Sequence, residues 1–180
     1  MIIFYQIIWL FLPAGIANMM AAISIFIFPK WNYPIDCKKE FKGKRIFGDH
    51  KTWRGLIIGT LSGGLIFLLQ RFLFNSYPHI QDISLVNYQN TSWLFGCLIG
   101  FGALFADAIK SFFKRQVGIP SGKSWFPFDQ LDWVIGAILV ISIFVKLSLS
   151  IIIVALILGL IIHLIAKIIG YILKINKSPI

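Results

Sequence analysis

The segment from Ala106 to Trp133 holds the side chains of this sequence that are best suited to chemistry. It reads ADAIKSFFKRQVGIPSGKSWFPFDQLDW and lies between two long apolar runs. Three of the chain's seven acidic residues fall within it, together with four basic residues: Asp107, Asp129, Asp132, Lys110, Lys114, Arg115 and Lys123. Carboxylates bind divalent cations, and basic side chains bind phosphates. The segment therefore predicts a site that handles a nucleoside triphosphate at the lipid surface.

The spacing of these residues predicts that they converge. If the helix that begins at Trp93 continues past the membrane, one of its faces carries four polar residues, with Arg115 close beside them: Asp107, Lys110, Ser111 and Lys114. Asp129 and Asp132 share a face at the start of the next helix. Acids there also favour the positive end of the helix dipole, which would account for either one alone. Three carboxylates together repel one another without a cation, and Mg²⁺ suits such a site.

The composition places the whole chain in a membrane. Of its 180 residues 58% are hydrophobic, and the mean hydropathy is +0.83, whereas soluble domains are about 45–50% apolar. The net charge of +10 does not indicate nucleic acid, because Lys and Arg concentrate in the cytoplasmic loops of membrane proteins and near anionic head groups. Cys37 and Cys97 form no metal or redox pattern, so free thiols are expected. We expect one transmembrane domain over residues 1–180.

The apolar runs predict an all-α polytopic protein with about five transmembrane helices. The expected spans are residues 2–28, 56–73, 93–106, 131–145 and 149–172. Residues 74–92 read as an irregular loop. Gly55, Gly59 and Gly63 recur every four residues, which favours close helix packing and leaves open a homodimer through glycine-rich faces.

The distribution of charge predicts the orientation in the membrane. With five spans, fifteen Lys and Arg residues fall on one side, including Lys174 and Lys177 of the tail, and two fall on the other. The positive-inside rule then places the N-terminus outside and the C-terminus in the cytoplasm. Six of the seven acids share the basic side. Attraction to lipid would explain the bases there but not the acids, so we expect an active site facing the cytoplasm of the plasma membrane.

The loop over residues 29–54 is rich in basic residues and contains FKGKRIFGDHKTWRG. Gly43 and Gly48 permit tight turns that could wrap phosphates, although the spacing is not that of a Walker A loop. A basic loop that only binds anionic lipid is the alternative. Asn18, inside the first span, is explained equally well by an inter-helix hydrogen bond of about 0.6 kcal/mol or by a ligand contact in a polar cavity. His79 receives no role, and His163 is expected to be packed or hydrogen-bonded.

The chemistry that these groups support is nucleotidyl transfer. A lipid phosphate oxygen would attack the α-phosphorus of a nucleoside triphosphate, and pyrophosphate would leave. Such a transfer needs positioning and charge neutralisation more than a protein nucleophile. A general base is not required, because a phosphomonoester is already ionised near pH 7.

At these residues the chain resembles the CDP-archaeol synthases, which are membrane CTP:2,3-di-O-geranylgeranylglycerol-1-phosphate cytidylyltransferases. The resemblance covers most of the chain, and its matching stretches are Pro13 with Asn18, Pro34-Ile35-Asp36, FKGKRIFGDHKTWRG, DAIKSFFKR and PFDQLDWVIGA. The last two also look like the signature of the wider phosphatidate cytidylyltransferase group. The resemblance implies a five-helix enzyme that uses CTP and Mg²⁺ to activate an ether-lipid phosphate.

The resemblance also implies roles for individual residues. Asp107, Asp129 and Asp132 would bind metal and triphosphate, and Lys114 and Arg115 would bind phosphate with Ser111 beside them. The residues implied to close over CTP or the lipid phosphate are Lys44, Arg45, Asp49, Lys51 and Arg54, with Asn18 and Asp36 as further substrate contacts. The chain departs from the family pattern at Ala106, where Gly is common, and at Gln116, where a basic residue is common. The first departure could alter helix packing at the metal.

Three alternatives stay open on the sequence. A phosphatidate cytidylyltransferase would make CDP-diacylglycerol from an ester lipid, and the apolar spans do not distinguish ester from ether. A CDP-alcohol phosphatidyltransferase is disfavoured because its DGxxAR…GxxxDxxxD pattern is absent. A small transporter with a basic cytoplasmic mouth would be expected to show internal repeats, which this sequence lacks, and would leave the clustered acids unexplained.

Overall fold

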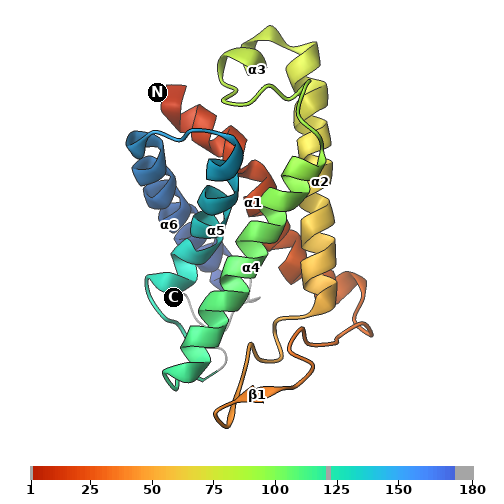
Figure 1. Cartoon of the computed structure of the whole chain (residues 1–180), viewed down its shortest axis with the longest axis vertical. Coiled ribbons are helices and arrows are strands. Elements are labelled where there is room, and N and C mark those ends of the chain that lie inside the picture. The colour runs from red at the N-terminus through yellow and green to blue at the C-terminus, as the bar shows by residue number, and fades with distance from the viewer. Residues whose placement is uncertain (1, 121–122, 173–180) are drawn as a thin grey trace.

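Among the described residues, five long helices make up the bundle. The structure, a computed structural model, describes residues 2–120 and 123–172. Its elements are α1 (Ile2–Ile27), β1 (Glu40–Phe41), β2 (Lys44–Arg45), α2 (Trp53–Ser76), α3 (Pro78–Asp82), α4 (Leu94–Gln116), α5 (Phe128–Phe144) and α6 (Leu149–Ile172). The α1–α2 and α4–α5 connections lie at the same end of the bundle, and the all-α prediction is confirmed (Figure 1). Lys174 and Lys177, which entered the expected topology, lie outside the described residues.

Four helices among the described residues are long and apolar enough to cross a membrane, namely α1, α2, α4 and α6. The fourth expected span, residues 131–145, corresponds to α5, which has 17 residues and is about 26 Å long at 1.5 Å per residue. The third expected span does continue beyond Ala106, because α4 runs without a break to Gln116. The expectation of an irregular segment over residues 74–92 was wrong in part. The end of α2 and the five residues of α3 are helical, with Pro78 at the first helical position of α3.

Glycines allow α1, α2 and α4 to approach one another closely. A Cβ added to Gly59 would lie 2.6 Å from the carbonyl oxygen of Ala17 in α1. A Cβ added to Gly63 would lie 2.6 Å from the carbonyl oxygen of Gly96 in α4. These faces are therefore occupied within the chain. A homodimer through glycine-rich faces stays a prediction, and the packing within the chain at Gly59 and Gly63 does not favour it.

Ala106 and Gly136 form a complementary contact between α4 and α5. A Cβ on Gly136 would lie 2.6 Å from the methyl carbon of Ala106 and 2.2 Å from the carbonyl oxygen of Gly102. Because Gly136 has no side chain, α5 leaves room for the methyl group of Ala106 on α4.

We expect Gly136→Ala to destabilise the protein by about 1–3 kcal/mol, the usual cost of overpacking. Adding Ala106→Gly to this variant should not restore stability, because the new Cβ at position 136 would still clash with the carbonyl oxygen of Gly102. Gly15→Ala is the control, since a Cβ there meets the Trp133 ring at 3.8 Å, an ordinary contact. Melting temperatures in the same detergent would test this. Equal melting of the two variants would contradict the packing argument.

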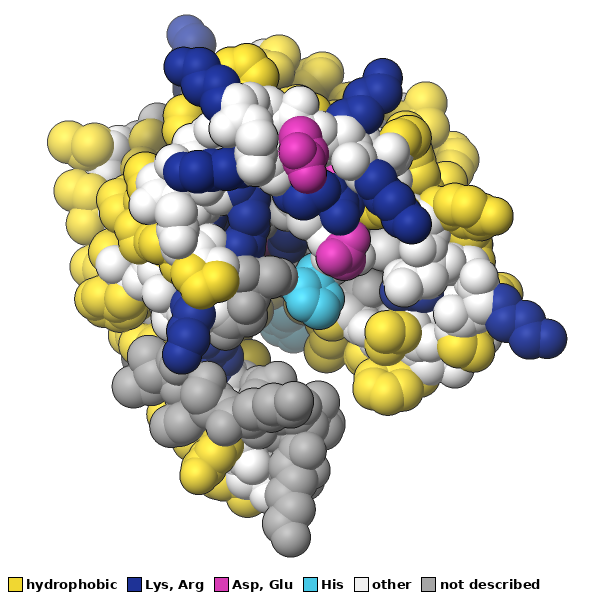
Figure 2. All heavy atoms as spheres, turned by 90° about the horizontal axis from the view of Figure 1, so that it is seen from below, with side chains coloured by type: hydrophobic (Ala, Val, Ile, Leu, Met, Phe, Trp, Pro, Cys, Tyr) yellow, Lys and Arg dark blue, Asp and Glu magenta, His cyan; other side chains and the backbone are white. Residues whose placement is uncertain are grey.

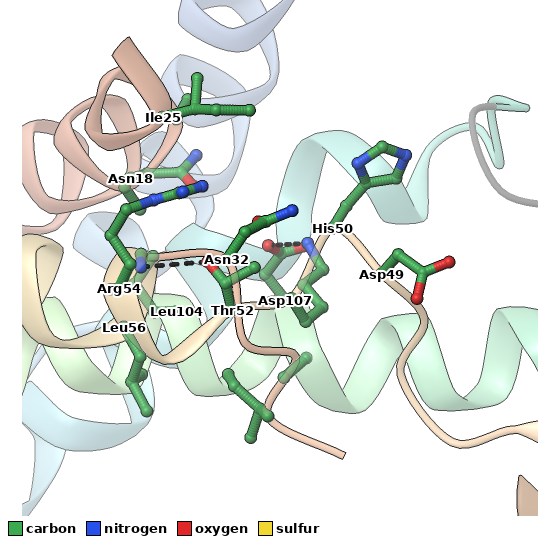
Figure 3. A pocket seen from close by; sticks show the side chains of 16 residues that line it. Asn18, Ile25, Asn32, Asp49, His50, Thr52, Arg54, Leu56, Leu104 and Asp107 are labelled. Carbon is green, nitrogen blue, oxygen red and sulfur yellow. Dashed lines mark hydrogen bonds and ion pairs between the residues drawn. The ribbon is translucent and has the colours of Figure 1, made fainter. Parts of the chain in front are cut away.

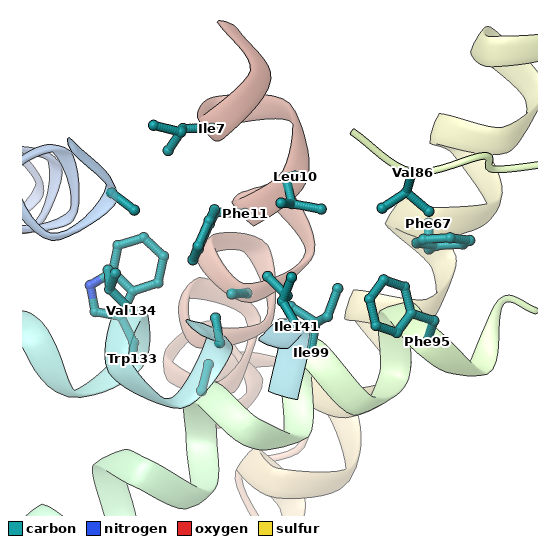
Figure 4. Packing of buried hydrophobic residues seen from close by; sticks show 14 of the residues in the cluster. Ile7, Leu10, Phe11, Phe67, Val86, Phe95, Ile99, Trp133, Val134 and Ile141 are labelled. Atoms are coloured by element: carbon teal, nitrogen blue, oxygen red, sulfur yellow. The ribbon is translucent and has the colours of Figure 1, made fainter. Parts of the chain in front are cut away.

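The apolar core occupies the middle of the bundle. Ile7, Phe11, Ile99 and Ile141 are buried to at least 95%, and Phe67 of α2 packs at its edge (Figure 4). Polar segments are thereby confined to the ends of the bundle. The segment between α1 and α2 carries the small antiparallel pair β1–β2 and lies at the lower end in Figure 1, below the C-terminal turns of α4. Seen from that end, Lys and Arg side chains surround a hollow that also holds acidic and His side chains (Figure 2).

Candidate active site

Lys110 stands at the centre of the three carboxylates that the sequence singled out. Its Nζ lies 3.1 Å from Asp107 Oδ1, 2.6 Å from Asp129 Oδ1 and 3.0 Å from Asp132 Oδ2. The first contact spans one turn of α4, and the other two join α4 to the first turns of α5. The predicted convergence of Asp107, Asp129 and Asp132 is therefore seen. We refer to these four residues as the carboxylate cluster.

Lys114 adds a second cation one turn further along α4. Its Nζ donates to Asp129 Oδ2 at 2.6 Å, and the backbone N–H of Trp125 donates to the same oxygen at 2.6 Å. Asp129 therefore accepts from both lysines and fixes the chain entering α5. Lys114 and Asp132 are buried, and Ser111 is buried beside them on α4. In such a setting these charges interact far more strongly than they would in water.

Lys51 connects the basic loop to the cluster. Its Nζ forms an ion pair and hydrogen bond with Asp107 Oδ2, drawn as a dashed line in Figure 3. Thr52 follows it, and its side chain accepts from the N–H of Gly55 and so caps α2. Because Lys51 directly precedes the capped start of α2, the position of its backbone is fixed by that helix.

Asp36 organises the interior of the loop. Its carboxylate accepts from the Arg45 guanidinium at 2.8 Å and from the backbone N–H groups of Lys38, Phe47 and Gly48 at 3.0 Å each. Burial opposes ionisation, but the guanidinium and the three N–H groups outweigh it and lower the pKa of Asp36 to about 2. The neighbouring carboxylates Asp36 and Asp49 raise the pKa of Arg45. These contacts support a structural role for Asp36 and Arg45 in shaping the loop.

We expect Asp36→Asn to loosen the loop, because an amide cannot accept all of these hydrogen bonds. In the wild type, the stability that the ionised Asp36 carboxylate gives to the loop is fully present at neutral pH. It declines as the pH falls below about 3.8, the unperturbed value, and is gone below about 2. Limited trypsin digestion at neutral pH would follow cleavage at the loop lysines, and we expect about tenfold faster cleavage in the variant. Asp49→Asn is the control, because the Asp49 side chain is 75% exposed. Equal cleavage rates would contradict the role assigned to Asp36.

The other predicted basic residues lie at the edges of the site. Arg54 is buried and donates to Ser24 Oγ and to the carbonyl oxygens of Phe28 and Trp31, so it fastens the end of α1 to the start of α2. The two remaining basic residues bind backbone carbonyl groups at the C-terminal end of α4: Lys44 donates to Gln116 at 2.7 Å, and Arg115 donates to Ile119 at 2.6 Å.

Two cavities adjoin the carboxylate cluster. One, of about 450 Å³, lies under the loop and is bordered by Asn18, Asp49, Lys51, Arg54 and Asp107 (Figure 3). The other, of about 270 Å³, is bordered by all four cluster residues, by Lys114, and also by Asn18. Asn18 thus touches both cavities, which favours the ligand-contact interpretation over a simple inter-helix hydrogen bond.

Lys110 is the central residue of the cluster, yet from the sequence it received no role of its own. The signal was present, because Lys110 follows Asp107 by one helical turn on the face already assigned to the site. A lysine one turn from an acid is common on helix surfaces as an ordinary ion pair. Its contacts with α5 could be seen only after the two helices were placed.

The cluster offers oxygen donors of the kind that Mg²⁺ prefers. Within residues 2–120 and 123–172, no three acidic, His or Cys side chains are arranged to hold a metal ion. Lys110 Nζ lies between the carboxylates instead. The carboxylate oxygens of Asp107 and Asp132 both lie within 3.1 Å of this one nitrogen, so they already surround a single positive charge. The donor chemistry therefore fits a divalent cation, and the residues that would hold it are Asp107, Asp129 and Asp132.

Comparisons with known proteins show the family of this chain. Residues 1–180 match the family model described as CarS-like, CDP-archaeol synthase. CDP-archaeol synthase from Pyrobaculum arsenaticum is 32% identical, covering 98% of this chain and 97% of the relative. The one from Methanoregula boonei is 35% identical, covering 93% and 98%. A solved structure of an intramembrane enzyme for archaeal membrane lipid biosynthesis has a TM-score of 0.72 at 30% identity, covering 89% of this chain and 92% of its own. The chain therefore belongs to the CDP-archaeol synthase family of membrane enzymes.

Proposed function

We propose that this protein transfers CMP from CTP to an isoprenoid ether glycerol phosphate and thereby forms CDP-archaeol and pyrophosphate. The observation that carries the proposal is the carboxylate cluster with Lys114, built at the end of a membrane helix pair and joined by Lys51 to a basic loop. Such a site offers both cation ligands and phosphate ligands next to the lipid. The relatives named CDP-archaeol synthase support this substrate class.

In the reaction, an oxygen of the lipid phosphate forms a bond to the α-phosphorus of CTP. The bond from that phosphorus to the oxygen bridging to the β-phosphorus breaks, and its electron pair leaves with pyrophosphate. Lys51 and Lys114 would bind the triphosphate and neutralise charge on the leaving group, which is the main requirement of such a transfer. Asp129 holds Lys114 and Lys110 in position. Asn18 borders both cavities and is suited to orient a substrate oxygen.

Mg²⁺ is the cofactor that we propose for Asp107, Asp129 and Asp132. When bound, it supplies neutralisation of the phosphate oxygens of the triphosphate. The support is the donor set, which consists of carboxylates, and the single positive charge that they already surround. The chain's own lysines then hold the remaining phosphate charge.

The proposed setting is the plasma membrane with the site facing the cytoplasm, where CTP is available. The excess of basic residues on the site's side supports an N-terminus outside. Residues 1–180 would act as a single domain, since the site draws on α1, the loop, α4 and α5 together. If the enzyme forms a homodimer, the packing within the chain favours a surface other than the glycine faces of α2 and α4.

A transfer assay tests the proposal. Purified protein receives radiolabelled CTP and Mg²⁺ with geranylgeranylglyceryl phosphate or phosphatidic acid, and Asp132→Asn is run beside it. We expect label in the lipid phase from the ether substrate and not from the variant. Label from phosphatidic acid alone would move the assignment to a phosphatidate cytidylyltransferase. No label from either lipid, with folded protein, would refute the transferase and favour the transporter.

A further inference from the structure

A third cavity, of about 600 Å³, lies between α1, α5 and α6 and differs in character from the other two. Its walls at one end are apolar and include Ile7 and Phe11 of α1 and Ala155 of α6. Trp133 and Val134 of α5 close its back, opposite Ile7 and Phe11 (Figure 4). The volume lies within the range of about 300–1,000 Å³ typical of ligand pockets. We call this cavity the apolar groove.

The other end of the apolar groove is polar. Asn18, His163 and Lys167 border it there, and the same three residues border the 270 Å³ cavity that contains the carboxylate cluster. The two cavities therefore adjoin at these side chains. A molecule with an apolar chain and an anionic head could place the chain in one cavity and the head in the other.

The length of the groove matches one leaflet of a bilayer. Eleven residues separate Ile7 from Asn18 on α1, and twelve separate Ala155 from Lys167 on α6, which corresponds to about 16–18 Å at 1.5 Å per residue. A single leaflet contributes about half of the 30 Å hydrocarbon core. Both helices run in the sequence from the apolar end towards the polar end, so the groove follows the direction in which a lipid chain lies.

Two buried nitrogen atoms belong to side chains that line this groove. Trp133 Nε1 and His163 Nδ1 have no hydrogen-bond partner among the described residues, although Trp133 is only 6% exposed. Buried N–H groups are rarely left without an acceptor. The glycerol and phosphate oxygens of a lipid are acceptors of the required kind, whereas a hydrocarbon chain alone is not.

The groove is also accessible from the membrane. Of the four spans recognised by length and hydropathy, α6 is the least buried. Ile161 and Ile162 are neighbours on it, and each is 45% exposed. Only Ile162 of this pair borders the groove, so the two positions separate groove contact from contact with bulk lipid.

We propose that the apolar groove holds a hydrocarbon chain of the lipid phosphate substrate, and that His163 and Lys167 receive its phosphate at the entrance to the carboxylate cluster. This inference rests on the proposed function, because it names where the second substrate of that reaction binds. It makes α6 part of the binding site, whereas from the sequence His163 was expected only to be packed or hydrogen-bonded within the protein. CTP would then occupy the cavity under the loop, and the two substrates would meet at Asn18 and Asp107.

Photo-crosslinking tests the groove without requiring turnover. The protein in nanodiscs receives an ether glycerol phosphate with a diazirine in its chain, and adducts are mapped by mass spectrometry. We expect adducts concentrated on the groove side of α1 and α6. Ile162→Trp should reduce them about tenfold, the usual scale for a misfit in an apolar pocket, whereas Ile161→Trp should leave them unchanged.

The phosphate contact is tested with a diazirine lipid alcohol that lacks the phosphate. The phosphate probe should give more groove adducts than the alcohol. In Lys167→Gln this difference in adduct yield should be about tenfold smaller, as expected for a lost charged hydrogen bond. Equal labelling of all lipid-facing helices, or equal effects of the two Trp variants, would overturn the groove. Equal labelling by both probes would overturn the phosphate contact. The radiolabel assay judges the transferase separately, so failure of either proposal is recognisable.

Discussion

Replacing Asp129 with Asn should lower kcat for CMP transfer by about 100- to 1,000-fold, the usual cost of losing one preorganised charged group at a phosphate site. Asp129 accepts from Lys110, Lys114 and the N–H of Trp125. An Asn has nearly the same shape but one acceptor oxygen and no charge. Both lysines would then lose a partner, and the proposed Mg²⁺ would lose a ligand.

Rates are compared at saturating CTP and lipid phosphate, after circular dichroism and melting show that the variant is folded. Asp82→Asn is the matched control, because Asp82 is exposed on α3, at the opposite end of the bundle from the cluster (Figure 1). It should retain wild-type activity. An Asp129→Asn enzyme with more than a tenth of wild-type kcat would show that Asp129 does not organise the reacting groups.

Replacing Lys110 with Met should destabilise the protein more than any other single removal of charge at the site. The ammonium group contacts three carboxylates on two helices. Removing one member of such a buried arrangement costs about 3–5 kcal/mol, because the remaining charges are left uncompensated. For a chain of this size we expect a fall in melting temperature of about 10 °C.

Lys123→Met is the matched control, because it removes the same charge from an exposed position that borders the same cavity. Its melting temperature should stay within about 2 °C of the wild type. Added Mg²⁺ should raise the melting temperature of Lys110→Met more than that of the wild type, since the carboxylates would then need another cation. Identical melting of Lys110→Met and wild type would contradict the central position of Lys110.

Periodicity and local spacing were sufficient to predict much of this protein. The apolar runs predicted the long helices, and the one-turn spacing of Asp107 with Lys110 and of Asp129 with Asp132 predicted their shared faces. What the sequence could not supply was the partner of each charge. Asp36 and Arg45 are used within the loop, a pairing that depends on how the backbone turns at Gly43 and Gly48, which have φ values of +71° and +90°.

Long-range packing explains the other differences. Gly59 and Gly63 looked available for another chain, because a sequence does not show that α1 and α4 already cover them. His163 looked like an isolated packed residue, because its neighbours Asn18 and Lys167 border the same cavities from different turns and helices. For these residues, the sequence indicates the property of the side chain. It does not indicate which distant segment of the chain packs against that side chain.

The shortness of α5 has a consequence for the membrane itself. At 17 residues the helix reaches about 26 Å, less than the 30 Å of a typical hydrocarbon core, and its first turns carry Asp129 and Asp132. This hydrophobic mismatch is relieved when the bilayer thins around the helix. Water and a triphosphate can then descend to a lipid head group that never leaves its leaflet. We therefore expect the rate of the enzyme to vary with the thickness of the bilayer that surrounds α5.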